Sequence, residues 1–243
     1  MRTILFTTIL FTGLAATPAH AQKLSGGIEA ATDESRRGLS WSEGRIATSA
    51  DLLVPVGPLE ASARVATVRD SVRHDGAEVV GDLELGAVTD LGPFRVRGHV
   101  TGHIFAGARS KMDYVELGGS GSYSLGPVQV NAGAVYAPDQ SAIGGSNLYL
   151  YAGANAGVPM TPLSASASIG RSSGNTDDPL RAARLRPTGT YSDWRIGLEY
   201  NSFPITFGID YVGTDIENRP GLSRFADARH SGDRVIGRAR ISF

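Results

Sequence analysis

The sequence contains no cysteine, which excludes disulfide bonds, thiolate metal sites and a lipid-modified cysteine. It also has no strong excess of charge, and a formal net charge of −1 excludes a strongly basic nucleic-acid binder. Beyond residue 21 no uninterrupted apolar stretch approaches the roughly 18 residues that a membrane helix needs. The motifs G-x-S-x-G, Walker A and H-E-x-x-H are missing. We therefore expect no catalytic residue, no cofactor and no nucleic-acid partner.

The first residues have the pattern of a signal peptide. Met1 and Arg2 form a short basic start, residues 4–16 are apolar, and Ala19-His20-Ala21 forms an A-x-A cleavage site. The apolar run is too short for a membrane anchor. We expect residues 1–21 to be removed after export, and residues 22–243 to form one domain or one barrel.

The sequence is rich in glycine, and apolar and polar residues alternate along several of its segments. Its 31 glycines are mixed with Ala, Val, Ser and Tyr, which favours an all-β chain. Residues 94–105 alternate strictly, with apolar or small residues at even positions and Arg, His or Thr at most odd positions. Residues 191–202 and 205–212 repeat this pattern. We expect further strands at residues 23–31, 45–56, 59–68, 77–90, 113–125, 128–137, 147–158, 163–171 and 234–243.

The connections alternate between short and long. Short turns fall at 56–58, 91–93, 125–127, 158–162 and 202–204, and longer polar loops fall at 32–44, 69–76, 106–112, 138–146, 172–190 and 213–233. This rhythm, and strands near nine to eleven residues long, are typical of outer-membrane barrels. We therefore predict a transmembrane antiparallel up-and-down β-barrel of about twelve strands. A soluble β-sandwich or barrel would show the same alternation and is the alternative.

A barrel in lipid turns its apolar face outward and its polar face to the lumen. The residues expected to face the membrane include the aromatic side chains of Phe94, Trp194, Tyr200, Phe207, Tyr211 and Phe243. The candidates for the lumen or its constriction are Arg95, Arg97, His99, Arg195, Arg234, Arg238, Arg240, Asp82 and Glu84. Rings of arginine select anions in pores. A salt-bridge network that fills a narrow barrel is the other interpretation, and we favour it.

Two further features are expected to be structural. His99 and His103 are four residues apart, which is about 13 Å on a strand and too far to chelate one metal ion. The charged loop residues are expected to be solvated, with folding into the mouth or binding of lipopolysaccharide phosphates as alternatives. They include Asp177, Asp178, Arg181, Arg184 and Arg186.

Several segments resemble the TorF family, a group of porin-like proteins of Gram-negative bacteria. Residues 32–42 (TDESRRGLSWS) are similar to the family's S-D-Y-x-x-R-G-x-S-x-S, with matches at Asp33, Arg37, Gly38, Ser40 and Ser42 and with Glu34 in place of the aromatic. Residues 113–116 (DYVE), 164–171 and 191–200 also resemble family segments, as do Tyr211, Thr214 and Asp215.

The resemblance implies a pore-like barrel in the outer membrane of a Gram-negative bacterium. We expect a channel for passive diffusion of small solutes, with an anion preference as one version. The alternative function is a closed structural or adhesive barrel whose loops bind partners. The expected partners are outer-membrane lipid, lipopolysaccharide and small solutes, and also the barrel assembly machinery, which reads a terminal aromatic such as Phe243.

Overall fold

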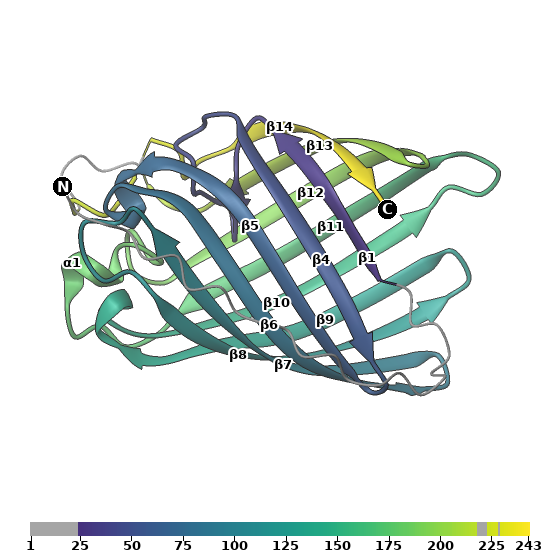
Figure 1. The fold of residues 1–243 in the computed structure, drawn as a ribbon, viewed down its shortest axis with the longest axis horizontal. Coiled ribbons are helices and arrows are strands. Elements are labelled where there is room, and N and C mark those ends of the chain that lie inside the picture. Colours follow the sequence, from purple (N-terminus) through teal and green to yellow (C-terminus); the bar gives the residue numbers. More distant parts are fainter. Residues whose placement is uncertain (1–23, 218–222, 228) are drawn as a thin grey trace, which may run out of the picture.

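Twelve long strands close into one antiparallel barrel in the computed structural model, which describes residues 24–217, 223–227 and 229–243 (Figure 1). The predicted signal peptide at residues 1–21 lies outside the described residues. The barrel strands are β1 (Ser25–Ala31), β4 (Ala47–Val56), β5 (Leu59–Ser71), β6 (Ala77–Leu91), β7 (Phe94–Ala106), β8 (Tyr114–Leu125), β9 (Val128–Gln140), β10 (Gly145–Gly157), β11 (Leu163–Ser173), β12 (Tyr191–Ser202), β13 (Ile205–Thr214) and β14 (Arg234–Ser242).

Each strand pairs with its sequence neighbour, and the barrel closes where β1 pairs with both β14 and β4. Gly27 lies opposite Ser242 in the first of these ladders and opposite Asp51 in the second. Closure leaves no unpaired sheet edge, so the backbone groups are satisfied without water. The predicted all-β fold, its topology and its strand number are confirmed.

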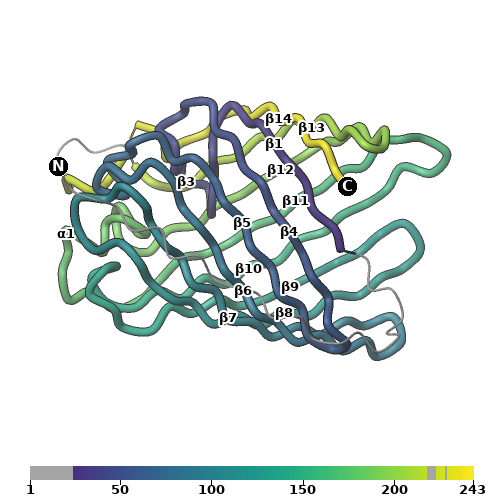
Figure 2. Tube along the Cα trace, in the orientation of Figure 1, coloured from purple at the N-terminus to yellow at the C-terminus, as the bar shows by residue number. Residues whose placement is uncertain are grey.

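The two ends of the barrel differ (Figures 1 and 2). At the short-turn end, Gly57, Gly92 and Gly126 each begin a two-residue turn with a positive φ, near +60°, which glycine adopts without a Cβ clash. At the long-loop end lie the short helices η1 (Val72–His74), η2 (Ser141–Ile143) and α1 (Pro179–Ala182). β5, β9 and β13 extend two or three residues further toward this end than predicted.

Side chains on the outer face are apolar and exposed, as Leu83 (56%) and Ile196 (61%) illustrate. The inner face carries the charged and polar positions of the same strands. No helix among the described residues is long and apolar enough to cross a membrane. A cluster of buried apolar side chains lies toward the long-loop end of the barrel, and we call it the mouth cluster. It comprises Leu39, Trp41, Ala66, Val68, Ala77, Val80, Phe105, Met112, Tyr114, Ala137, Ala142, Ile143, Leu185, Tyr191, Ile216 and Phe225.

Candidate functional site

The connection between β1 and β4, residues 32–46, folds into the barrel, and we call it the inner hairpin. It contains the two short strands β2 (Ser35–Arg36) and β3 (Leu39–Ser40). Arg37 and Gly38 form the turn between them, with φ of 51° and 72°. Two consecutive positive φ angles define a type I′ turn, whose twist matches the twist of a hairpin. The turn therefore projects the Arg37 side chain from the tip of the hairpin.

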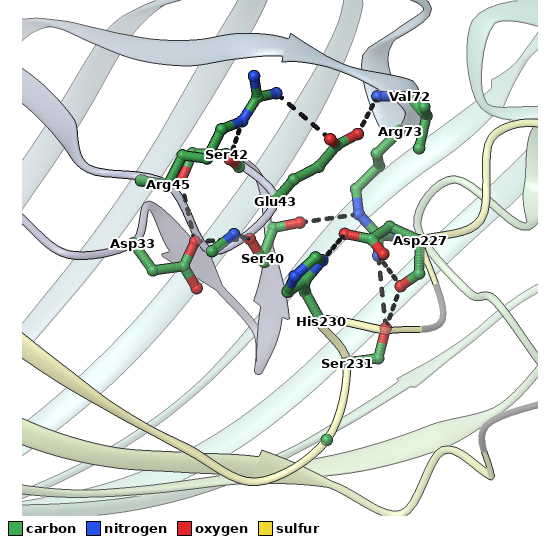
Figure 3. Close-up of polar contacts among 12 residues, drawn as sticks. Asp33, Ser40, Ser42, Glu43, Arg45, Val72, Arg73, Asp227, His230 and Ser231 are labelled. Atoms are coloured by element: carbon green, nitrogen blue, oxygen red, sulfur yellow. Dashed lines mark hydrogen bonds and ion pairs between the residues drawn. The ribbon is translucent and has the colours of Figure 1, made fainter.

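Asp33 stabilises the base of the inner hairpin. Its Oδ1 accepts hydrogen bonds from the hydroxyl groups of Ser40 (2.5 Å) and Ser42 (2.9 Å), and its Oδ2 pairs with Nε of Arg234 on β14 (2.7 Å). Figure 3 shows Asp33, Ser40 and Ser42 together with the loop residues that contact them. The matched residues of the TorF-like segment 32–42 thus meet in one structure, the inner hairpin.

Arginine side chains tie the inner hairpin to the barrel wall. Arg36 pairs with Asp82 on β6 (2.7 Å), and Arg37 pairs with Glu116 on β8 (2.7 Å). Arg64 on β5 pairs with Glu34 of the hairpin (2.7 Å). Burial by itself lowers the pKa of Arg36, but the charges of Asp82 and Glu34 outweigh burial and raise it, so this guanidinium remains charged. The hairpin is therefore held by ion pairs on several sides.

The inner hairpin has a cavity on each side. Cavity A has a volume of about 340 Å³ and lies between the hairpin and the wall formed by β5 to β8, with Trp41, His99 and Glu116 among its lining residues. Cavity B has a volume of about 320 Å³ and includes Glu29, Asp193 and Arg238. Arg37 and Arg64 line both cavities. The hairpin thus divides the lumen.

The predicted lumen residues point inward and are mostly paired with each other or with further carboxylates. Arg97 pairs with Glu84 (2.5 Å) and Glu60 (3.2 Å), and His99 lies 3.8 Å from Glu84. Further pairs of these residues within the lumen are Arg195–Asp210, Arg238–Asp210, Arg238–Glu199, Arg238–Glu29, Arg240–Asp51 and Arg234–Asp33. Arg95 differs, because it pairs with Asp90 at the short-turn end, where both side chains are more than half exposed. These ion pairs match the favoured interpretation of a salt-bridge network.

The predicted outward aromatic residues lie on the outer face of the barrel. Phe94, Tyr200, Phe207, Tyr211 and Phe243 are between 41% and 63% exposed, and Trp194 is half-buried. The two histidines of β7 take different partners. His103 lies between Asp82 (2.7 Å) and Glu116 (3.3 Å), whereas His99 faces Glu84. Within the described part of the chain, no group of three or more His, Asp or Glu residues is placed to hold a metal ion.

The expectation of solvated loop charges holds for Asp177, which is exposed, and is wrong for Arg184 and Arg186. Arg184 is fully buried and donates to the carbonyl oxygens of Met112 (2.7 Å) and Ala142 (3.2 Å). Arg186 donates to the loop carbonyls of residues 146, 174 and 175. Packed loops leave carbonyl oxygens without water, and a guanidinium group can satisfy several of them at once.

His74 and Arg73 complete this buried polar group beneath the loops. Arg73 donates to the carbonyl oxygens of Ser40 (3.0 Å), Arg184 (2.6 Å) and Asp227 (3.1 Å), and Figure 3 shows its contacts with Ser40 and Asp227. His74 accepts a hydrogen bond from Nε of Arg184 (3.2 Å). Burial, and then the charges of Arg184 and Arg73, lower the pKa of His74 well below 6.5. Burial likewise lowers the pKa of Arg184 to about 10.

Sequence reasoning missed the contribution of the inner hairpin and of its partners on the wall. Arg36, Arg37 and Glu34 were placed in a polar loop, and Glu116 and Asp193 were not among the candidates for the lumen or its constriction. The signal that could have found them was the TorF-like segment itself, because a dense group of matched residues in a loop points to function more than to packing.

A substitution at the hairpin tip tests whether the inner hairpin packs closely against the barrel wall. A Cβ atom added to Gly38 would lie 2.8 Å from Cβ of Asp193 and 2.9 Å from the carbonyl oxygen of Gly213, and it would overlap Thr214. We expect Gly38→Ala to lower the free energy of unfolding by about 2 kcal/mol or more, from backbone strain and overpacking together. The urea midpoint in detergent measures this loss.

Gly57→Ala is the matched control, because Gly57 has a similar φ of 63° but open space around its Cβ position. Gly57→Ala should lower the free energy of unfolding by only about 1 kcal/mol, from backbone strain alone. Equal losses for the two variants would contradict tight docking of the hairpin.

The closed barrel is similar in fold to solved structures of outer-membrane porins. A structure described as "KdgM porin" is similar with a TM-score of 0.57 and 8% identity, over 90% of this chain and 99% of that one. The Salmonella typhi OmpF in complex with daunomycin is similar with a TM-score of 0.50 and 8% identity, over 91% and 97% of the two chains. At such identities the likeness shows the fold alone.

In sequence, residues 15–231 match the family described as "Bacterial protein of unknown function (Gcw_chp)". This match spans most of the chain, so the protein belongs to that family. No curated protein sequence matches the chain.

Proposed function

We propose that this protein is a narrow channel of the Gram-negative outer membrane through which small solutes diffuse passively. The observation that carries the proposal is the inner hairpin, which crosses the lumen of a porin-like barrel and leaves cavities A and B beside it. The exposed apolar side chains on the outside suit lipid, and the ion pairs on the inside suit an aqueous lumen. The channel acts without catalysis and without a cofactor.

The residues of the inner hairpin also support the proposed TorF identity. Asp33, Arg37, Gly38, Ser40 and Ser42 are the matches in that resemblance, and they hold the base and the tip of the hairpin. In a family of channels, we expect the segment that sets the width of the lumen to vary least in sequence. Glu34, which replaces the aromatic residue, instead pairs with Arg64 and Arg36.

One observation favours the second candidate, a closed structural barrel. The mouth cluster and the buried Arg73, His74 and Arg184 fill the long-loop end with packed side chains. If this packing is permanent, solutes do not pass, and the remaining exposed loop residues would bind partners such as lipopolysaccharide. The two candidates therefore differ in whether the mouth cluster opens.

Planar-bilayer recording of the purified barrel tests the channel. We expect discrete conductance steps, small ones because the hairpin narrows the lumen. A heat-dependent shift on SDS gels verifies that the same preparation is a folded barrel. A barrel that shows the heat shift but never conducts would support the structural function instead. Protein that lacks the shift and fractionates with soluble proteins would contradict both functions.

A further inference from the structure

We propose that the channel prefers cations and that Asp193, beside the tip of the inner hairpin, is the residue that determines this preference; the inference rests on the proposed channel function. It concerns the same lumen, and it names the class of solute that passes, small cations. The sequence interpretation of an anion-favouring constriction counted arginines. The structure also shows which carboxylate each of these arginines meets.

The guanidinium groups of the lumen do not present free positive charge. Those of Arg36, Arg37, Arg97 and Arg240 each lie within 2.7 Å of a carboxylate oxygen. The single guanidinium group of Arg238 contacts three carboxylates, those of Asp210, Glu199 and Glu29. Because each positive charge is cancelled at short range, an approaching anion finds no unpaired guanidinium group in this set.

Asp193 is the exception among the carboxylates. It is 7% exposed, and its Oδ1 accepts a hydrogen bond from the hydroxyl of Tyr149 (3.1 Å). Within the described residues it has no arginine, lysine or histidine partner at ion-pair distance. The nearby Arg37 stacks over Tyr149 at 4.7 Å, but its guanidinium forms its ion pair with Glu116. Asp193 therefore has no ion-pair partner in the part of the chain that the structure describes.

The position of Asp193 places its charge where the tip of the inner hairpin meets the barrel wall. It lies on β12, and its Cβ would be 2.8 Å from a Cβ added to Gly38 at the hairpin tip. Asp193 lines cavity B, where five carboxylate residues face four arginines. A cation in cavity B is thus attracted by the carboxylate of Asp193, which no ion pair neutralises among the described residues, and an anion is repelled by it.

The two cavities also differ in polarity. Leu39, Trp41, Val135 and Leu185 line part of cavity A, whose arginines and carboxylates are balanced. Cavity B is lined by more charged side chains than cavity A. Ions need a hydrated path, because transfer of an ion against apolar walls is costly. The route for ions therefore runs through cavity B, past Asp193.

The reversal potential across a bilayer with a KCl gradient tests the inference. The wild-type channel is expected to favour K⁺ over Cl⁻. Asp193→Asn should lower the ratio of K⁺ to Cl⁻ permeability by about sixfold, because one unit charge roughly 8 Å away in water favours K⁺ and disfavours Cl⁻ by about 2.4-fold each. Asp193→Glu restores the charge and should keep the preference. Asp70→Asn is the control, since it removes the same charge from an exposed position at the long-loop end.

The outcomes separate this inference from the proposed function. Bilayers that stay silent while the heat shift is intact contradict the channel itself. A conducting barrel that prefers anions overturns the cation preference alone. A cation preference that Asp193→Asn and Asp70→Asn alter equally, or not at all, overturns the assignment to Asp193. The heat shift of each variant verifies its folding before recording.

Discussion

Replacement of residues 36–39 by two glycines is expected to raise the single-channel conductance several-fold. Ser35 and Ser40 lie opposite each other in the hairpin, so a two-residue turn can join them without moving the strands that follow. The replacement removes Arg36, Arg37 and Leu39, and with them the ion pairs to Asp82 and Glu116. Cavities A and B then merge into one wider lumen.

The matched control shortens a turn that is remote from the lumen. Residues 159–162 at the short-turn end can be replaced by two glycines, because N–H of Val158 already donates to the carbonyl oxygen of Leu163 (2.9 Å). This variant should keep the wild-type conductance. If both variants keep it and both show the heat shift, the inner hairpin does not set the width of the conducting path.

Acidification below pH 6.5 is expected to loosen the mouth cluster through His74. This ring lies 4.4 Å from Trp41 and 4.6 Å from Phe105, and its Nδ1 accepts from Arg184. Protonation would remove that acceptor and would add positive charge beside Arg73 and Arg184. Opening of the loops relieves the repulsion, so the packed mouth becomes less stable in acid.

The direction in which stability changes with pH depends on the shift in the pKa of His74. Burial, and then Arg184 and Arg73, lower the pKa of His74 below 6.5 in the packed mouth, whereas the opened state retains a value near 6.5. Below pH 6.5 only the opened state takes up the proton, so stability is full above this pH and falls as the pH decreases. The loss is up to about 1.4 kcal/mol for each pH unit.

Fluorescence of Trp41 can follow this change in a Trp194→Phe background, because the chain has two tryptophans. His74→Gln keeps an acceptor for Arg184 but does not titrate, so it should remove most of the dependence between pH 5 and 6.5. Arg36 and His103 also lie near His74, and their contributions to the pH dependence remain in this variant. His230→Gln, at a partly exposed histidine, should leave the dependence unchanged. An unaltered pH profile in His74→Gln would contradict the prediction.

The barrel could be predicted because its signals are local. Alternation of residues 94–105 defines the two faces of β7, and Gly92 with Pro93 defines the turn before it. A strand that is buried in lipid on one face must repeat this alternation along its whole length. Strand ends near the long-loop end were less accurate, because β5 and β9 continue into the polar segments that pack beneath the loops.

The candidate site could be predicted only in part. The sequence placed Arg97, Arg195 and Arg238 on the inner face, where the structure has them. It did not show their partners, since pairing depends on barrel closure and on loops that fold inward. Arg240 and Asp51, for example, are 189 residues apart and meet only because β14, β1 and β4 are neighbours. An arginine count therefore overestimated the positive charge of the lumen.

The sequence by itself determined the twelve strands, their inward and outward faces and the alternation of short and long connections, because each depends on residues close together in the chain. The tertiary structure decided that residues 32–46 enter the lumen, that Arg184 is buried and that Asp193 has no ion-pair partner among the described residues. Those features depend on contacts between distant segments. Polar loops carry no periodicity that reports whether water or the barrel wall will satisfy their charges.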